Sequence, residues 1–168
     1  MYPVPPKKLT VGIPVPILQA MSYRQILYQI VFCTKYRNPV ITDIHCEELY
    51  KYIWGVIKNK KCTLFRINGI EDHIHILSDL HPSVALADFV KEIKVASSLW
   101  MKASGLFPDF EGWAEGYGAF TYSIKERDRV INYIKKQKEH HRNITFNDEY
   151  KNLLDEHGVA YDENHLFP

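Results

Sequence analysis

Two periods of apolar residues alternate along this chain, and their order predicts its fold. Short, dense apolar runs indicate strands, in which successive side chains point to opposite faces. Longer segments with apolar residues three and four positions apart indicate helices that bury one stripe. Strands are predicted over residues 26–33, 62–67, 70–78 and 117–122, and helices over residues 42–59, 82–104, 123–142 and 147–157.

Through residue 142 the order is β-α-β-β-α-β-α, which is that of an α+β protein with a ferredoxin-like split β-α-β fold, and the chain ends with an added C-terminal helix. Such a fold forms an antiparallel sheet that carries helices on one face and leaves the other face free to work. Asn68-Gly69 predicts the turn before the third strand, and Ser123 with Glu126 predicts a capping box at the third helix. The fold alone does not decide the chemistry.

The beginning of the chain differs in composition from the rest. Its prolines exclude a regular helix or an inner strand over residues 1–21. We therefore expect a flexible Pro-rich leader over residues 1–21, with Met21 as a candidate start, and a single domain over residues 22–168. No segment approaches the roughly 20 apolar residues that cross a bilayer, so no membrane partner is expected.

The third predicted strand carries two histidines two positions apart. Alternate side chains of a strand share a face, so His73 and His75 point the same way while Ile74 points the other way. Two imidazoles on a rigid support can bind a divalent metal ion. Histidine pairs on strands also occur as hydrogen-bonded core residues, so the pair alone leaves both interpretations open.

A tyrosine and an amide on the third predicted helix sharpen the metal hypothesis. Tyr133 and Gln137 are four residues apart and therefore share a helical face, where a packed aromatic beside a solvated amide is the alternative interpretation. Beside the histidine strand, Gln137 would give an oxygen ligand to a metal at His73 and His75, with Tyr133 about one helical turn away. This mixed nitrogen and oxygen set suits Mg²⁺ or Mn²⁺ better than structural zinc.

The same set predicts phosphoryl chemistry. A divalent ion polarises a phosphoryl oxygen and stabilises the charge that develops in a displacement. A phenol is a weak nucleophile at its ordinary pKa of about 10, and a nearby cation favours the phenolate. Attack of Tyr133 on phosphorus would then give a covalent phosphotyrosine.

Three residues beside these motifs have two interpretations each. His140 and His141 follow Gln137, but adjacent side chains on a helix diverge by about 100°, which favours hydrogen bonding or packing over one shared ion. Asp72 either orients an imidazole or only forms the turn into the strand.

Composition narrows the setting of the protein without deciding its function. The chain has 168 residues, of which 46% are hydrophobic and 24% are charged, as in a soluble globular protein. The net charge of +1 argues neither for nor against a nucleic-acid partner, although local lysine clusters could form basic patches. Three cysteines without a C-x-x-C pair indicate neither a disulfide framework nor a zinc finger, so a reducing cytoplasm is the simplest location.

Motifs along most of the chain resemble one family. The H-I-H strand, the Y-I-K-K-Q helix segment and the segment Y-Q-I-V-F-C-T-K-Y-R are similar to the single-tyrosine HUH transposases of small bacterial insertion sequences, the IS200-like transposases. The related REP-associated tyrosine transposases share this pattern. The similarity covers about residues 22–165, and it includes I-K-V-A-S-S, W-A-E-G-Y-G-A and Q-K-E-H-H.

The resemblance implies a role for each candidate residue. His73 and His75 would be the paired metal ligands, Gln137 the third ligand and Tyr133 the nucleophile. Members of this family cut single-stranded DNA, retain a 5′-phosphotyrosine and leave a free 3′-hydroxyl that later rejoins strands without ATP. They work as dimers and recognise DNA hairpins near element ends. We therefore expect a homodimeric transposase that depends on Mg²⁺ or Mn²⁺.

The same resemblance suggests which residues contact the DNA backbone, with a solvated surface as the equal alternative. Two other functions stay open. One is a domesticated relative that nicks repeats with the same residues, and the other is a non-catalytic module that binds single-stranded nucleic acid. A pure binder would not need the tyrosine and glutamine in register with the histidine pair. The expected DNA contacts are Lys35, Tyr36, Arg37, Lys94 and Ser97.

Overall fold

The structure, a computed structural model, describes residues 24–163 and residue 166. The leader expected over residues 1–21 lies outside this part of the chain and stays a prediction, as does the domain start at residue 22.

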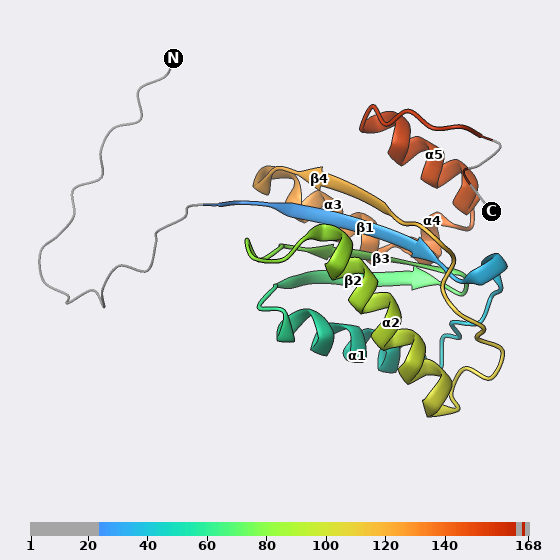
Figure 1. The fold of residues 1–168 in the computed structure, drawn as a ribbon. Helices are drawn as coiled ribbons and strands as arrows, with labels where there is room; N and C mark the ends of the chain where they lie inside the picture. Colours follow the sequence, from blue (N-terminus) through green and yellow to red (C-terminus); the bar gives the residue numbers. More distant parts are fainter. Residues whose placement is uncertain (1–23, 164–165, 167–168) are drawn as a thin grey trace, which may run out of the picture.

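A four-stranded antiparallel sheet organises the described residues (Figure 1). The strands are β1 (Leu27–Cys33), β2 (Leu64–Ile70), β3 (His73–Ser78) and β4 (Gly118–Tyr122), in the spatial order β2-β3-β1-β4. Every neighbouring pair is antiparallel. This order confirms the α+β, ferredoxin-like fold that the sequence predicts.

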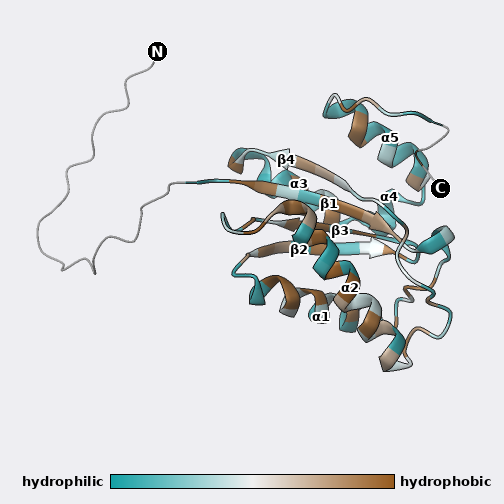
Figure 2. Ribbon diagram, in the orientation of Figure 1, coloured by the Kyte–Doolittle hydropathy of each residue, from teal (hydrophilic) through white to brown (hydrophobic). Residues whose placement is uncertain are grey.

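Two long helices cover one face of the sheet, α1 (Cys46–Asn59) and α2 (Leu86–Ser104) (Figure 1). Figure 2 shows hydrophobic and hydrophilic residues alternating along both helices, as expected for helices that bury one stripe. The largest apolar core of the described residues lies here. Its fully buried members include Ile30, Ile74 and Ile76 from the sheet and Leu49, Ile53, Phe89 and Ile93 from the helices.

The other face is also covered, by α3 (Arg127–Lys135), α4 (Gln137–His140) and α5 (Phe146–Glu156). The expectation of a free working face is therefore wrong for this conformation, because the added C-terminal helix folds back over the sheet (Figure 1). Two small apolar clusters hold these helices. Leu27, Leu77, Val130 and Ile134 pack beneath α3, and Val31, Phe120, Phe146, Leu153 and Leu154 pack beneath α5.

The turn between β2 and β3 lies later than predicted. Asn68 and Gly69 belong to β2, in register with His75 and Ile74, and the turn is formed by residues 71–72. The side-chain amide of Asn68 explains why it is not a turn residue. It donates hydrogen bonds to the carbonyl groups of the last residues of α3, at 2.9 and 3.1 Å. The strand is thereby tied to the end of the helix that carries Tyr133.

The helix predicted over residues 123–142 is divided. A 3₁₀ turn (Ile124–Glu126) precedes α3, and Lys136 separates α3 from α4 with φ −96° and ψ 17°. The carbonyl groups at the end of α3 accept bonds from the β2 side chain, which satisfies them where the helix ends. The capping box at Ser123 is confirmed, with its N–H 3.0 Å from Oε2 of Glu126.

The remaining helix boundaries differ little from the predicted ones. α1 begins a few residues after the expected start, and a side-chain cap at Thr145 starts α5, where its hydroxyl accepts a hydrogen bond from the N–H of Asp148. Within the part of the chain that the structure describes, no helix has the length and hydropathy needed to cross a membrane.

Gly69 fixes how closely β2 approaches β3, and its replacement tests this packing. A Cβ atom at Gly69 would overlap the carbonyl oxygen of His73 and lie 2.9 Å from the Cα atom of Ile74. We expect Gly69→Ala to lower the free energy of unfolding by about 1–3 kcal/mol, as measured by urea denaturation. Gly55→Ala on α1 is the control, since nothing lies within 4 Å of its Cβ position, and it should stabilise the helix by about 0.5–1 kcal/mol. Equal stability of the two variants would contradict the packing argument.

Candidate metal centre

The four side chains singled out by the sequence meet between the sheet and the helices α3–α5. His73 and His75 are fully buried on this side of β3. Gln137 begins α4, and its Oε1 atom lies 3.4 Å from the Nε2 atom of His73. The ring of Tyr133 lies edge-on to that of His75, with 6.0 Å between the centroids. The structure therefore brings all four residues together within one chain, while their roles stay predictions.

Asp72 fixes the orientation of His73. Its Oδ1 atom accepts a hydrogen bond from Nδ1 of His73 at 2.7 Å, and its Oδ2 atom accepts two from Arg37, at 2.6 and 3.2 Å. With the proton of His73 on Nδ1, the lone pair of Nε2 faces the interior of the site. Asp72 also lies in the turn before β3, so both interpretations offered by the sequence hold.

Gln29 on β1 lies at the Nδ1 atom of His75, as Asp72 lies at the Nδ1 atom of His73. Its side-chain amide lies 3.0 Å from Nδ1 of His75, yet the amide oxygen and Nε2 of His75 are buried without a hydrogen-bond partner. An amide turned so that its oxygen accepts the Nδ1 proton would leave the Nε2 lone pair of His75 facing inward. That buried nitrogen has no hydrogen-bond partner, and a metal ion would satisfy its lone pair.

His141 also turns toward this centre, and it makes hydrogen bonds, one of the two roles that the sequence favours for it. Its Nδ1 atom lies 3.0 Å from the carbonyl oxygen of Ile144, and its Nε2 atom lies 3.1 Å from Oε1 of Gln137. His140 lies at the rim, where its ring packs edge-on against Tyr133. The two histidines diverge as expected, and His141 alone of the two joins the group of possible metal ligands.

A buried carboxylate from α5 completes the cluster. The Oε2 atom of Glu149 lies 3.6, 3.3 and 3.0 Å from the Nε2 atoms of His73, His75 and His141. At His75 the two atoms are close but are not aligned as a hydrogen bond, which is why its nitrogen is an orphan. The ligand atoms of the three imidazoles and this carboxylate all lie within 4.8 Å of one another.

The second oxygen of Glu149 contacts the predicted nucleophile. Oε1 accepts hydrogen bonds from the hydroxyl of Tyr133 and from the amide of Gln137, the latter at 2.7 Å. None of the sequence motifs includes Glu149, because the last helix is predicted only as an addition to the fold. A signal existed: Glu149 falls on the apolar stripe of α5, between Phe146 and Leu153, where a carboxylate is costly unless it has partners.

Burial and charge set the protonation states of these groups. Burial lowers the pKa of His73, so its imidazole is neutral at pH 7. Burial alone would raise the pKa of Glu149, but the hydrogen bond from His141, the charge of the nearby His75 and the hydrogen bond from Tyr133 outweigh it and hold this pKa well below its ordinary range. Burial raises the pKa of Tyr133, and the Glu149 carboxylate raises it further. In this conformation the tyrosine is a neutral phenol beside an anion.

These residues fit a divalent cation. Imidazole nitrogens and a carboxylate or amide oxygen are ordinary ligands of such ions, and the outer nitrogen of each inward histidine is held by a hydrogen-bond partner. Without a cation, several lone pairs face one another in a buried space, which is unfavourable.

Three of the expected DNA contacts form a 3₁₀ turn (Lys35–Arg37) after β1, in which Tyr36 and Arg37 have φ of 56° and 55°. Tyr36 is 67% exposed, with the ammonium group of Lys35 over its ring. Arg37 donates hydrogen bonds to the carboxylate of Asp72, and its Nη1 atom donates to Oδ1 of Asn147 at 2.5 Å. Lys35 and Tyr36 therefore lie at the surface, whereas Arg37 joins the turn to the site and to α5.

The other two expected contacts have structural partners. The ammonium group of Lys94 donates to two carbonyl groups of the loop before β4, at 2.7 and 2.8 Å. Ser97 is fully buried, and its hydroxyl donates to the carbonyl of Ile93 at 2.6 Å and accepts from the indole of Trp113 at 2.9 Å. The structure contradicts the expectation for Ser97, because a hydroxyl without exposed surface cannot contact a DNA backbone.

Known proteins share this fold and these motifs. The family model for IS200-like transposases matches residues 22–137, a span that includes the histidine strand, Tyr133 and Gln137. The chain therefore belongs to the IS200-like transposase family, whose members are enzymes that cleave DNA during transposition.

Two relatives illustrate the similarity in sequence. The ISDra2 transposase TnpA of Deinococcus radiodurans is 26% identical over 120 residues, which cover 67% of this chain and 84% of that protein. The transposase for insertion sequence element IS200 of Salmonella typhimurium is 27% identical over 119 residues, which cover 67% of this chain and 76% of that protein.

Two solved structures are similar in fold. A crystal structure from D. radiodurans R1, described as a candidate transposase, has a TM-score of 0.56 and 25% identity, and the match covers 72% of this chain and 98% of that one. The REP-associated tyrosine transposase bound to a REP hairpin has a TM-score of 0.52 and 16% identity, with 72% and 74% covered. The second likeness concerns the fold alone.

The opposite pKa shifts of two histidines can be measured in the metal-free protein. Burial lowers the pKa of His73 below its ordinary 6.5, whereas the Glu149 carboxylate outweighs burial at His141 and raises the pKa of that group. We expect NMR titration midpoints below 6.5 for the first and above 6.5 for the second. His73 contributes stability that is present above pH 6.5 and is lost as the pH falls through its folded pKa. A midpoint of His73 above that of His141 would contradict this description.

Proposed function

We propose that this transposase cuts and rejoins single-stranded DNA through a 5′-phosphotyrosine on Tyr133. One observation carries the proposal: the hydroxyl of Tyr133 and the amide of Gln137 meet on one carboxylate oxygen of Glu149. A phosphodiester is likewise an anion whose oxygens accept hydrogen bonds. The nucleophile and the groups that bind an anion thus surround one position, which is what attack on a phosphate requires.

The proposed reaction is a transesterification. The Tyr133 hydroxyl loses its proton to solvent as its oxygen bonds to phosphorus, and the bond between phosphorus and the 3′ oxygen breaks. The 3′ oxygen takes up a proton, so one strand ends in a free 3′-hydroxyl while the other stays on the tyrosine. Attack of a 3′-hydroxyl on that linkage reverses the step and rejoins strands. One phosphodiester replaces another, so the reaction needs no ATP.

We propose that His73, His75 and Gln137 hold Mg²⁺ or Mn²⁺ during this reaction. Such an ion, when bound, polarises a phosphoryl oxygen and neutralises the charge that develops in the displacement. The surrounding residues prepare the ligands for this task. Asp72 holds the proton of His73 on Nδ1, and Gln29 can do the same for His75, so that both Nε2 lone pairs face inward.

We further propose hairpin-bearing single-stranded DNA as the substrate, and a homodimer in the cytoplasm as the working form. The relative of similar fold was solved bound to a REP hairpin, which supports a hairpin partner. Lys35 and Tyr36 offer a cation and an aromatic ring at the surface beside the site. The described cysteines are free thiols, as a reducing compartment requires. Light scattering of the purified protein would give its oligomeric state.

The role of Tyr133 is tested with Mn²⁺ and single-stranded DNA from the flanks of the protein's own gene. We expect the wild type to form an SDS-resistant covalent adduct, and Tyr133→Phe to form none while it retains DNA binding. Tyr52→Phe is the control, because this phenol stacks on Trp100 on the other side of the sheet. An unchanged adduct in Tyr133→Phe would remove the proposed nucleophile. Binding without any adduct in the wild type would leave the non-catalytic binding module.

The orienting role of Gln29 is tested by its effect on metal affinity. Gln29→Met keeps the size of the side chain but cannot accept the Nδ1 proton of His75. We expect this variant to bind Mn²⁺ about 10–100-fold more weakly, the usual range for loss of a partner that orients a metal ligand. Isothermal titration calorimetry gives the affinity. Gln25→Met, at an exposed position just before β1, should leave it unchanged. Equal affinities in both variants would remove Gln29 from this role.

A further inference from the structure

Three imidazoles are oriented in the same way around the Glu149 carboxylate. The outer Nδ1 atoms of His73, His75 and His141 lie 2.7, 3.0 and 3.0 Å from side-chain or carbonyl partners. Their inner Nε2 atoms lie 3.6, 3.3 and 3.0 Å from one oxygen of Glu149. An imidazole held at its outer nitrogen and presenting the inner one is the usual arrangement of a metal-binding histidine.

The same carboxylate closes the site. His73, His75 and Gln137 have no exposed surface, and Glu149 is 2% exposed. A phosphodiester of DNA therefore cannot reach these donors while Glu149 covers them, and the Tyr133 hydroxyl, which is only partly buried, is hydrogen-bonded to the same carboxylate. For the proposed reaction to occur, this carboxylate must leave.

We propose that the DNA-free protein holds a divalent cation in a closed site of four donors, His73, His75, His141 and Glu149, and that single-stranded DNA opens the site by displacing Glu149 together with α5. This inference rests on the proposed function in one respect, because it assumes that a DNA phosphate uses the same position. In the open site, His73, His75 and the Gln137 oxygen would remain as the metal ligands during the reaction with DNA.

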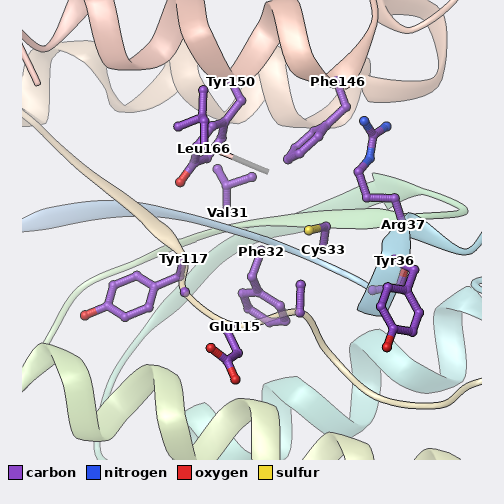
Figure 3. A pocket seen from close by; sticks show the side chains of 13 residues that line it. Val31, Phe32, Cys33, Tyr36, Arg37, Glu115, Tyr117, Phe146, Tyr150 and Leu166 are labelled. Carbon is purple, nitrogen blue, oxygen red and sulfur yellow. The ribbon is translucent and has the colours of Figure 1, made fainter. Parts of the chain in front are cut away.

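The attachment of α5 suits a helix that can be displaced. Among the described residues, eighteen buried side chains form the core beneath α1 and α2, and five form the cluster beneath α5. A pocket separates part of α5 from the end of β1 and the loop before β4, and Figure 3 shows Phe146 and Tyr150 reaching toward Val31 and Cys33 across it. Arg37 adds a polar tie to this helix through Asn147.

The two states of the site would prefer different metals. Three imidazoles and one carboxylate, with no position left open, form a set that suits tetrahedral zinc or cobalt. The open site, with fewer imidazoles and an amide oxygen, suits Mg²⁺ or Mn²⁺. Zn²⁺ should therefore stabilise the closed form and oppose DNA cleavage.

Cobalt makes the closed site visible, because tetrahedral Co²⁺ absorbs visible light far more strongly than octahedral Co²⁺. We expect full-length protein with Co²⁺ to show the tetrahedral band. Glu149→Gln should lose this band and bind Co²⁺ at least about tenfold more weakly. Glu156→Gln makes the same chemical change on the same helix, where its side chain is 54% exposed, and should keep the band. A band retained in Glu149→Gln would overturn the assignment of this ligand.

Displacement by DNA is measured in Tyr133→Phe protein, which cannot form the covalent product. Fluorescence anisotropy measures binding of the single-stranded oligonucleotide from the gene's flanks. The tetrahedral Co²⁺ band should disappear as the fraction of DNA-bound protein rises. In this background, Glu149→Gln should bind the same DNA more tightly, because the competing carboxylate is gone. A band that survives in the DNA-saturated protein would overturn the displacement.

Hydrogen exchange of the wild type decides the matter if Glu149→Gln does not fold. Zn²⁺ should slow exchange of the backbone amides of α5, and the oligonucleotide should accelerate it. Unchanged exchange in both cases would overturn the proposal. The outcomes also separate this inference from the proposed function. A covalent adduct without a tetrahedral band would remove only the closed site, and a band without any adduct in the wild type would remove only the transposase chemistry.

Discussion

The rest of this site depends on the contacts that surround the buried carboxylate of Glu149. A charge removed from water is stable only with close partners, and here the partners are imidazoles, a phenol and an amide from β3, α3, α4 and the residue that follows α4. The same contacts hold α5 against the sheet and keep the site closed. Order in the last helix and order at the metal centre are therefore one physical property.

Around this carboxylate, the protein controls orientation mainly through groups that touch no substrate. Asp72 sets the tautomer of His73, Gln29 lies at the corresponding nitrogen of His75, and Arg37 connects Asp72 to the first turn of α5. These contacts come from β1, the turn after it and the β2–β3 turn. Thus β3 supplies the paired histidines, while β1 and the turns at the ends of the strands supply the residues that orient them, which makes the sheet the rigid part of the site.

The sequence predicted the sheet, the two helices of the large core and the meeting of the strand histidines with Tyr133 and Gln137, because apolar periodicity and short spacing determine these features. It did not predict the part played by Glu149, because a contact between the last helix and the third strand depends on how α5 folds back. The turn was misplaced for a similar reason. Asn68 is engaged by the end of α3, a tertiary contact that overrides local turn preference.

The pairing of β2 with β3 has a consequence beyond stability. Ile74 and Ile76 face the large core while the two histidines face the site, so a slip of one position would exchange them. Imidazoles would then lie among aliphatic side chains, and isoleucines would replace the ligands. The close approach at Gly69 opposes such a slip near the turn, and the irregular pairing between Leu64 and Arg66 lies at the far end of the same two strands. Strand alignment is thus itself a requirement for assembling the proposed site.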